Sequence, residues 1–218
     1  MHVSIVIPAR NAAETIAETL ESVRSQSSQD WEAIVVDDGS SDATASVAAS
    51  LATRDSRIRV VSRPHRGVSA ARNTGIEHAR FDRLVFLDAD DWLSPSFLER
   101  MTRELAQNPG LDAVHCRWSR VAPDGTLCGG DQFSDAAGDL FDLFACTCVF
   151  AVHACIIRKS LVEAVGGFDT SLRICEDWDL WQRIARTGAR FGAVQEVLAL
   201  YRMRRASASV NGPPSSEI

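Results

Sequence analysis

The sequence has no hydrophobic run long enough to cross a membrane. A membrane-spanning helix needs about 20 consecutive apolar residues, and no stretch of the 218-residue chain approaches that length. Residues 1–8 are too few and too uncharged to form a signal peptide. We therefore expect a cytoplasmic protein, whose contact with the inner face of the cell membrane would be peripheral or made through a partner.

The sequence also lacks the basic excess that is typical of proteins that bind nucleic acids. It contains 23 lysine and arginine residues against 29 aspartate and glutamate residues, which gives a formal net charge of -6. A surface that binds nucleic acid must neutralise phosphates and normally carries a basic patch or stripe. We expect no nucleic-acid partner.

Two common phosphate-binding motifs are missing as well. The loop after the first predicted strand, Pro8-Ala9-Arg10-Asn11, contains no Gly-x-Gly-x-x-Gly, and no Gly-Lys-Ser/Thr occurs in the chain. Those motifs bind dinucleotide or nucleoside triphosphate phosphates through glycine-rich turns. Their absence argues against a dinucleotide-dependent oxidoreductase and against a P-loop enzyme.

The six cysteines do not indicate a disulfide framework, because no secretion signal accompanies them. The group Cys146-Thr147-Cys148, His153 and Cys155 invites a zinc interpretation, but its spacing matches no common zinc pattern. We expect reduced thiols that serve mostly in packing.

Short apolar runs alternate with amphipathic stretches over the first ninety or so residues, which predicts βα units around a mostly parallel sheet with helices on both faces. The fold class is α/β. The predicted strands lie at residues 3–7, 31–36, 58–62 and 84–87. The predicted helices between them lie at residues 12–26, 43–54 and 68–78.

The pattern is looser further along the chain. We expect a helix ending near residue 107, a strand at 113–121, a helix at about 176–186 and short strands at 191–201. A glycine- and aspartate-rich stretch precedes residue 142 and predicts a mobile loop. We expect one domain over residues 1–210 and a disordered tail at 211–218.

The first acidic cluster is Asp37-Asp38, at the end of the second predicted strand. Helix capping accounts for the Ser40-Ser41-Asp42 that follows, but it gives no reason for two adjacent aspartates at a strand end. A carboxylate there can accept the imide N–H of a uracil or thymine base. Ligands bind beyond the carboxyl ends of the strands in open α/β sheets, so this position favours a binding role.

The second cluster, Asp88-Ala89-Asp90-Asp91, follows the fourth predicted strand. Three carboxylates within four residues repel one another unless a cation offsets them, and Mg²⁺ or Mn²⁺ prefers oxygen ligands. Alternate residues of an extended segment share a face, so Asp88 and Asp90 can point to one site. A solvated acidic loop would give the same pattern.

The third cluster, Glu176-Asp177, opens the last predicted helix. Acidic residues in a first turn also interact favourably with the helix dipole, so the pattern has a purely structural explanation. A catalytic acid–base group can occupy the same place. The order of the three clusters favours the functional interpretation.

Taken together, these motifs resemble those of glycosyltransferase family 2, whose members have the GT-A fold. The resemblance spans residues 3 to about 209 and rests on the segments 3–11, 36–42, 67–75, 86–91, 166–169, 176–180 and 201–202. It implies an inverting glycosyltransferase that transfers a sugar from a nucleoside diphosphate sugar to a hydroxyl group. Residues 1–92 would then form the nucleotide-sugar half, and residues 93–210 the acceptor and catalytic-base half.

The resemblance assigns roles to individual residues. The nucleotide-sugar ligands would be Pro8, Ala9, Arg10, Asp38, Arg72, Asp88 and Arg204. Of these, Asp38 would bind the base and Asp88 would lie at the ribose and diphosphate. Arg72 has the alternative of a helix-surface arginine.

The catalytic groups follow from the same resemblance. Asp90 would ligate Mn²⁺ or Mg²⁺, Asp177 would be the general base, and Glu176 would support the site from behind the residues that touch the ligands. Family members often carry a histidine two residues after the Tyr-Arg pair, where this chain has Arg204. A guanidinium cannot ligate a metal but can pair with phosphate, so the diphosphate would depend more on arginine here.

The donor is expected to be a UDP-sugar and the acceptor a glycan or a lipid-linked glycan of bacterial surface polysaccharide synthesis. Two alternatives stay open. One is another nucleotide-dependent transferase, such as a nucleotidyltransferase. The other is a nucleotide-sugar-binding module without catalysis, which would be recognised by replaced carboxylates; all are present here.

Overall fold

The computed structural model describes residues 1–122, 126–128 and 135–203. One nine-stranded sheet runs through this part of the chain. Its strand order is β3 (Ile58–Arg63), β2 (Trp31–Asp38), β1 (Val3–Ala9), β4 (Arg83–Phe86), β8 (Cys155–Arg158), β6 (Ala113–Val121), β9 (Arg190–Arg202) and β5 (Trp92–Leu93), with β7 (Gly138–Asp139) paired to β9.

The strands β3, β2, β1 and β4 are mutually parallel, and we call them the parallel half. They confirm the predicted βα repeat, because each expected strand is present within a few residues. Every residue of β1 and β2 is buried, as expected for strands covered on both faces. Asp38 lies inside β2 rather than beyond it, because main-chain pairing with β3 continues through Asp38 and Arg63.

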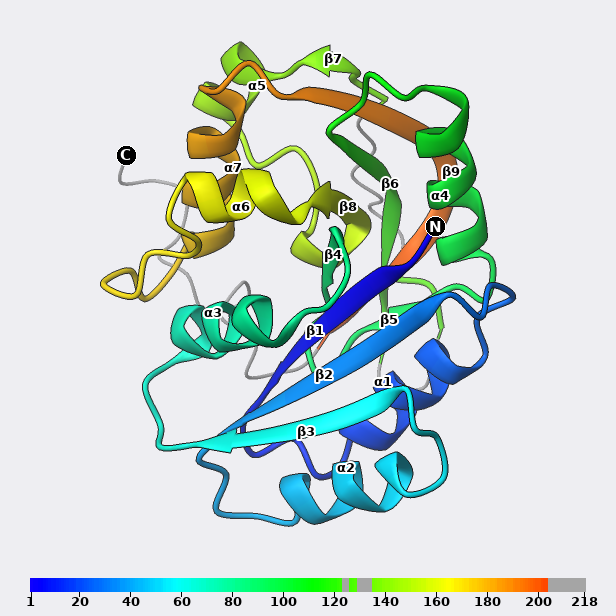
Figure 1. Ribbon diagram of the computed structural model, residues 1–218, viewed down its shortest axis with the longest axis vertical. Coiled ribbons are helices and arrows are strands. Elements are labelled where there is room, and N and C mark those ends of the chain that lie inside the picture. The colour runs from blue at the N-terminus through cyan, green and yellow to red at the C-terminus, as the bar shows by residue number, and fades with distance from the viewer. Residues whose placement is uncertain (123–125, 129–134, 204–218) are drawn as a thin grey trace.

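The other strands form a mixed half, in which β8 is antiparallel to both β4 and β6 while β6 and β9 are parallel. The expectation of short strands at 191–201 is wrong, since β9 is a single strand of 13 residues. Its register against β6 shifts on either side of Arg117. A bulge of this kind breaks the two-residue alternation by which a strand is recognised in a sequence. In Figure 1, β9 curves across the top of the molecule and down one edge.

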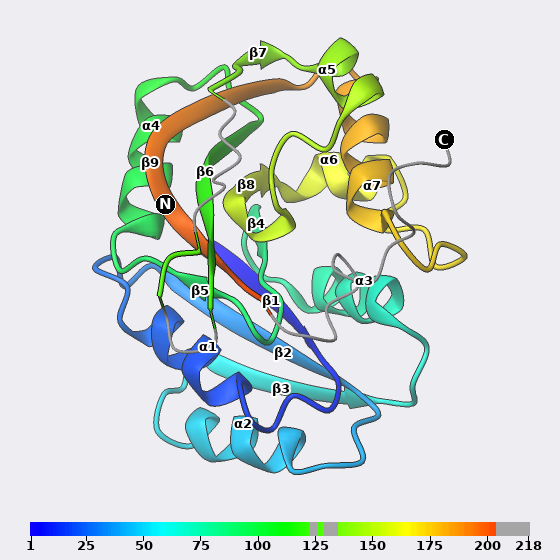
Figure 2. The ribbon, with the colours of Figure 1, turned by 180° about the vertical axis from the view of Figure 1, so that it is seen from behind.

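The helices are α1 (Ile16–Arg24), α2 (Thr44–Ala52), α3 (Val68–His78), α4 (Phe97–Gln107), α5 (Phe141–Cys146), α6 (Lys159–Ala164) and α7 (Glu176–Ala185), with a 3₁₀ turn η1 (Val152–Ala154). Helix α3 lies against β1 and β2, while α1 and α2 pack together on the other side of the parallel half (Figures 1 and 2). None of the helices in the described ranges is long and apolar enough to pass through a membrane.

Helix α1 starts four residues later than predicted, because the segment before it forms a turn. The main-chain N–H of Thr15 donates to the carbonyl of Ala12, and the Thr15 hydroxyl donates to the carbonyl of Ala89 at 2.9 Å. The turn thereby ties the loop after β1 to the acidic segment after β4. Two loops that lie far apart in the sequence are held side by side.

Helix α3 approaches the sheet closely. A Cβ atom on Gly75 would lie 2.2 Å from a methyl carbon of Val6 in β1, well inside van der Waals contact. Glycine is therefore required at this position of the helix, despite its low helix propensity. The close contact fixes α3 and the side chains that it carries against the parallel half.

Candidate functional site

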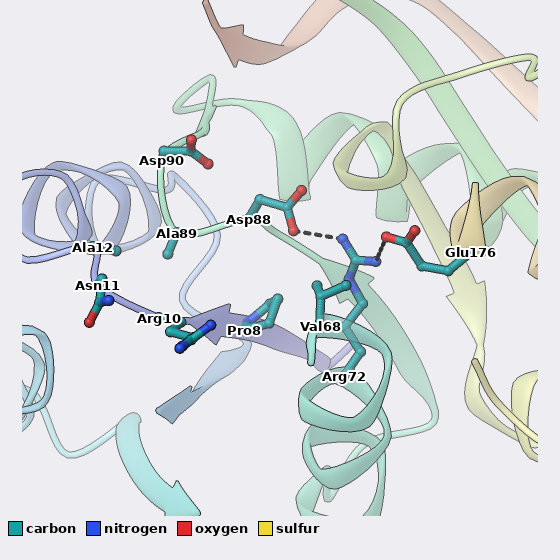
Figure 3. Close-up of a pocket in the computed structure, with 10 residues that line it drawn as sticks. All are labelled: Pro8, Arg10, Asn11, Ala12, Val68, Arg72, Asp88, Ala89, Asp90 and Glu176. Carbon is teal, nitrogen blue, oxygen red and sulfur yellow. Dashed lines mark hydrogen bonds and ion pairs between the residues drawn. The ribbon is translucent and has the colours of Figure 1, made fainter. Parts of the chain in front are cut away.

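A pocket of about 260 Å³ opens beyond the carboxyl ends of the parallel strands. Five segments line it: the end of β1, the loop after β1, the start of α3, the acidic segment after β4 and the start of α7. The lining residues are Pro8, Arg10, Asn11, Ala12, Val68, Arg72, Asp88, Ala89, Asp90 and Glu176 (Figure 3). Both halves of the sheet therefore contribute to one pocket, as expected for an open α/β sheet.

Arg72 is the central polar residue of this pocket. Its guanidinium donates one hydrogen bond to Asp88 Oδ1 at 2.7 Å and another to Glu176 Oε1 at 2.8 Å, as the dashed lines in Figure 3 show. Arg72 is only 2% exposed, so the alternative of a helix-surface arginine is wrong. Burial alone would lower the pKa of Arg72, but Asp88 and Glu176 outweigh it and raise the pKa above its ordinary value. The ion pairs join the acidic segment to the start of α7.

The pocket carries more acidic than basic side chains. Three carboxylates line it, from Asp88, Asp90 and Glu176, against two guanidinium groups, from Arg10 and Arg72. Among the lining residues that the structure describes, the acidic side chains thus outnumber the basic ones by one. Carboxylate oxygens facing a pocket with excess negative charge suit a hard divalent cation. Within the described ranges, no group of three or more His, Cys, Asp or Glu residues is placed to hold a metal ion.

Asp38 lies behind the pocket wall rather than in it. It is 3% exposed and is not a lining residue. Its Oδ2 accepts hydrogen bonds from the Gly67 N–H at 2.8 Å and from His65 Nδ1 at 2.7 Å, and its Oδ1 accepts one from the Arg66 N–H at 3.1 Å. Arg63 adds an ion pair. The carboxylate expected to receive the nucleotide base already holds the turn that begins α3.

Asp177 follows Glu176 in the first turn of α7 but does not line the pocket. Burial raises the pKa of this carboxyl, Arg72 lowers it, and Glu176 raises it again, so that the pKa lies above its ordinary value. Its Oδ1 accepts a hydrogen bond from the Trp178 N–H at 2.8 Å. A carboxylate with a raised pKa is a stronger base than an ordinary aspartate.

The structure brings together a subset of the predicted site residues, namely Pro8, Arg10, Arg72, Asp88, Asp90 and Glu176. Of the others, Ala9 is buried in β1, and neither it nor Asp38 or Asp177 lines the pocket. Arg204 lies outside the described residues. The pocket thus brings together the loop after β1, the second acidic cluster and Glu176 of the third acidic cluster.

Asn11 also lines the pocket, although it was not among the predicted site residues. Its backbone has a positive φ of 49°, which asparagine tolerates better than most residues. Its side-chain oxygen accepts a hydrogen bond from the Ser41 N–H at 2.9 Å, and its own N–H donates to Ser40 Oγ at 3.0 Å. Ser40 and Ser41, which were expected to act as caps, hold the first loop in place. Its position directly after Pro8-Ala9-Arg10 is the feature of the sequence from which a place in the pocket could have been predicted.

Asp91 belongs to the second acidic cluster, but no ligand was predicted for it. It is 1% exposed, and its Oδ1 accepts a hydrogen bond from the Arg202 N–H at 2.8 Å. Its Oδ2 lies 3.2 Å from Nδ1 of the buried His153. Burial raises the pKa of Asp91 and lowers that of His153 to about 4. Asp91 therefore ties the acidic segment to the end of β9 and to η1 and does not face the pocket.

The cysteines form no metal centre among the residues that the structure describes. All are free thiols; Cys116 and Cys155 are buried, whereas Cys128, Cys146 and Cys175 are exposed. The expectation that most of the cysteines serve in packing is wrong, because only two of the six are buried. Burial raises the pKa of the Cys148 thiol to about 12, an effect to which Asp177 adds.

Comparison with known proteins identifies the family of the chain. The model of the family described as "Glycosyl transferase family 2" matches residues 4–165. The glycosyltransferase EpsJ of Bacillus subtilis is 32% identical over 92% of this chain, and chondroitin synthase of Pasteurella multocida is 28% identical over 85%. The chain spans 60% of the first relative and 19% of the second.

Solved structures with the same fold include glycosyltransferases with bound nucleotide sugars. Staphylococcus aureus TarS 1-349 in complex with UDP-GlcNAc aligns with a TM-score of 0.82 at 18% identity, over 98% of this chain and 62% of that one. The mannosyltransferase PcManGT of Pyrobaculum calidifontis, in complex with GDP-Man and Mn²⁺, aligns with a TM-score of 0.74 at 24% identity, over 94% and 58%. These similarities establish the GT-A fold. The matched family model covers most of the sequence, and the chain belongs to glycosyl transferase family 2.

Proposed function

We propose that the chain is the catalytic part of an inverting glycosyltransferase that transfers a sugar from a nucleoside diphosphate sugar to a hydroxyl group of a glycan or lipid-linked acceptor. The observation that carries the proposal is the Arg72 bridge, which brings the acidic segment and the start of α7 to one pocket. A donor diphosphate bound at Asp88 and a base at the start of α7 would then be close enough to act on the same transferred sugar. TarS and PcManGT, which share the fold, bind nucleotide sugars.

The diphosphate would bind with the help of Mn²⁺ or Mg²⁺. Three carboxylates, from Asp88, Asp90 and Glu176, line the described part of the pocket, so a diphosphate would bind beside them more favourably if a cation entered with it. Asp90, and Asp88 beside it, supply the carboxylate oxygens that such a cation prefers. When bound, the metal would stabilise the charge that develops on the departing nucleoside diphosphate. Arg10 would add a guanidinium at the rim.

Asp177 would act as the general base. It would take the proton of the acceptor hydroxyl while that oxygen attacks the anomeric carbon, and the bond from that carbon to the diphosphate oxygen would break on the opposite side. The carbon would be inverted in this single displacement. The raised pKa of Asp177 supports the role, since it brings the basicity of the carboxylate closer to neutral pH.

For Asp38 we propose an indirect role in nucleotide binding. Its hydrogen bonds to His65, Arg66 and Gly67 shape the turn before Val68, which lines the pocket. The base would lie against that turn. We further propose a UDP-sugar donor, for which the fold shared with TarS in complex with UDP-GlcNAc is the support. A role in making bacterial surface polysaccharide is proposed from the similarity to a chondroitin synthase of Pasteurella multocida.

A panel of UDP-, GDP- and dTDP-sugars tests the proposal, with thermal unfolding measured in the presence of Mn²⁺. A ligand at 100 times its Kd stabilises a protein by about 2.7 kcal/mol, so binding would raise the Tm by several degrees. We expect the largest shift with a UDP-sugar and little shift after EDTA treatment. Release of nucleoside diphosphate in the presence of an acceptor would then demonstrate transfer, whereas pyrophosphate release would indicate a nucleotidyltransferase. Binding without any product would indicate a module without catalysis.

A further inference from the structure

Asn73, the residue after Arg72 on α3, holds a distant part of the backbone. Its side-chain Nδ2 donates a hydrogen bond to the carbonyl of Phe168, and its Oδ1 accepts one from the N–H of Phe168, both at 2.8 Å. A side-chain amide that binds both main-chain groups of one residue fixes the position and the orientation of that residue. Asn73 and Phe168 are 95 residues apart in the sequence. We call this pair of hydrogen bonds the Asn73 clasp.

The residue before Phe168 is shaped to allow the clasp. Gly167 has a φ of +71°, and a Cβ atom on it would lie 2.6 Å from Asn73 Oδ1. Any other residue would push the amide away from the chain and would also be strained at this φ. The Gly166-Gly167-Phe168 segment therefore has the sequence that a close approach to Asn73 requires.

The side chain of Phe168 continues the contact into the site. The ring is buried and packs edge-on against Phe86 of β4, with centroids 4.8 Å apart. The Arg72 guanidinium lies 5.0 Å from the centre of the same ring. Phe168 therefore lies between the strand that leads to Asp88 and the arginine that bridges Asp88 and Glu176.

Two neighbouring residues of α3 thus hold both ends of one loop. Asn73 holds Phe168, where the loop begins, and Arg72 holds Glu176, where it ends. The loop between them includes Arg173, Ile174 and Cys175, which are all exposed. Few buried contacts restrain these residues, so the two attachments to α3 fix the ends of the loop. The rest of α7 is held separately, since Trp178 Nε1 and Gln182 Nε2 both donate to the carbonyl of Phe144. Helix α3 is itself fixed to β1 by the Gly75 contact.

We propose that Asn73 is a positioning residue: its clasp on Phe168 sets where the first turn of α7, and with it Asp177, lies relative to the donor pocket. This inference rests on the proposed function, because it assumes that Asp177 acts on an acceptor beside a bound donor. Asn73 does not line the pocket, so its loss should leave donor binding nearly unchanged. A misplacement of about 1 Å at a catalytic group can cost about 100-fold in rate.

The test is the kinetics of Asn73→Ser and Asn73→Asp. The first variant removes the amide, and the second keeps the acceptor for the Phe168 N–H while placing an oxygen against the Phe168 carbonyl. We expect kcat to fall by about 10- to 100-fold, with the donor KM and the nucleotide-dependent Tm shift changed by less than about twofold. Asn108→Ser is the matched control, since Asn108 is an exposed asparagine at the end of α4 whose side chain donates hydrogen bonds to Glu104, one turn earlier in the same helix. It should leave kcat unchanged.

A second measurement follows the loop itself and needs no catalysis. Burial and the neighbouring Asp177 and Glu176 raise the pKa of the exposed Cys175 thiol. Because the thiolate is the form that reacts with a disulfide reagent, the rate at Cys175 reports whether the first turn of α7 stays in place beside it. In a background with Cys128→Ser and Cys146→Ser, which removes the other exposed thiols, Asn73→Ser should speed the reaction at Cys175 several-fold. Gly167→Ala should give the same result, because its methyl group would displace the amide of Asn73.

The outcomes separate the inference from the proposed function. An active wild type whose kcat is unchanged by both Asn73 variants, or whose donor affinity falls as much as kcat, overturns the positioning role and leaves the function in place. A wild type that transfers no sugar from any donor overturns the function and the inference with it. If Asn73→Ser does not fold, the Asn73→Asp kinetics and the Gly167→Ala thiol rates decide.

Discussion

The parallel half and the mixed half of the sheet differ in how they contribute to the pocket. The parallel half presents its residues from the ends of buried strands and from α3, which Gly75 fixes to β1. The mixed half contributes Glu176 and the proposed base from a helix that follows an exposed loop. Asn73 and Arg72 join the two. A binding surface can therefore be built rigidly from one half, while the placement of the catalytic group depends on contacts between the halves.

The largest expected effect separates the two halves by function. Asp177→Asn should lower kcat by about 10²–10⁴-fold, because a general base contributes that much, and should leave nucleotide affinity nearly intact. Initial rates and a nucleotide titration on the same variant measure both. Asp179→Asn, on the same turn of α7 but paired with Arg183, is the control and should retain most activity. Equal losses of affinity and rate would remove Asp177 from the role of base.

Breaking the bridge between the halves should cost stability as well as activity. Arg72→Met leaves Asp88 and Glu176 without their shared partner, and removal of one member of a buried ion pair costs about 3 kcal/mol. Urea unfolding measures the change. Arg103→Met, which removes an exposed ion pair with Glu99 on α4, should cost about 0.5 kcal/mol. Similar losses in the two variants would show that the bridge contributes little to the stability of the fold.

The parallel half can be disturbed alone by Gly75→Ala. The added methyl group would collide with Val6, and such overpacking costs about 1–3 kcal/mol. Unfolding in urea again gives the answer. Gly110→Ala serves as the control, because a Cβ at Gly110 would meet no atom within 4 Å. A stable Gly75→Ala variant would mean that α3 can shift away from β1 without penalty.

A smaller effect is expected at the metal. Asp90→Ala should weaken nucleotide binding in the presence of Mn²⁺ by about tenfold, equivalent to about 1.4 kcal/mol, and should abolish the difference that EDTA makes to the wild type. Isothermal titration with UDP measures both. Glu77→Ala, at an exposed position of α3, removes a carboxylate without affecting the pocket. Unchanged affinity in Asp90→Ala would take Asp90 out of the metal site.

The pH dependence of kcat gives the smallest predicted effect. Asp177 must be ionised to accept a proton, and its pKa lies above the ordinary value, so activity should fall on the acid side at a higher pH than an ordinary aspartate would produce. Arg72 lowers this pKa. Its replacement by glutamine should therefore move the acid limb to higher pH. A limb that moves to lower pH, or does not move, would show that Asp177 is not the titrating group.

The parallel half could be predicted from the sequence because its signals are local. A buried strand shows as a short apolar run, and such runs lie at residues 5–7 of β1, 33–36 of β2 and 84–86 of β4. Each run ends at the residues that carry the motifs, so the positions of Arg10 and Asp88 followed from the pattern. The existence of the pocket could be inferred in the same way from the topology of an α/β sheet.

The mixed half could not be predicted to the same extent, because its strands pair across long distances. Strand β9 contains a shift of register, which hides its continuity. Strand β8 is antiparallel to β4 and to β6, so it lies outside the βα repeat by which the parallel strands are recognised. The prediction of the site was incomplete for a similar reason. That Arg72 is buried, that Asp38 is already hydrogen-bonded and that Asn73 holds Phe168 all depend on partners distant in the sequence.

The Arg72 bridge also bears on how salt should affect the protein. Arg72 is buried between two carboxylates, whereas Arg10 is exposed at the rim of the pocket. At physiological ionic strength the Debye length is about 8 Å, and screening acts mainly on exposed charges. Added salt should therefore weaken the attraction between Arg10 and an arriving diphosphate while leaving the bridge intact. The ionic-strength dependence of donor association would then report on Arg10 and not on Arg72.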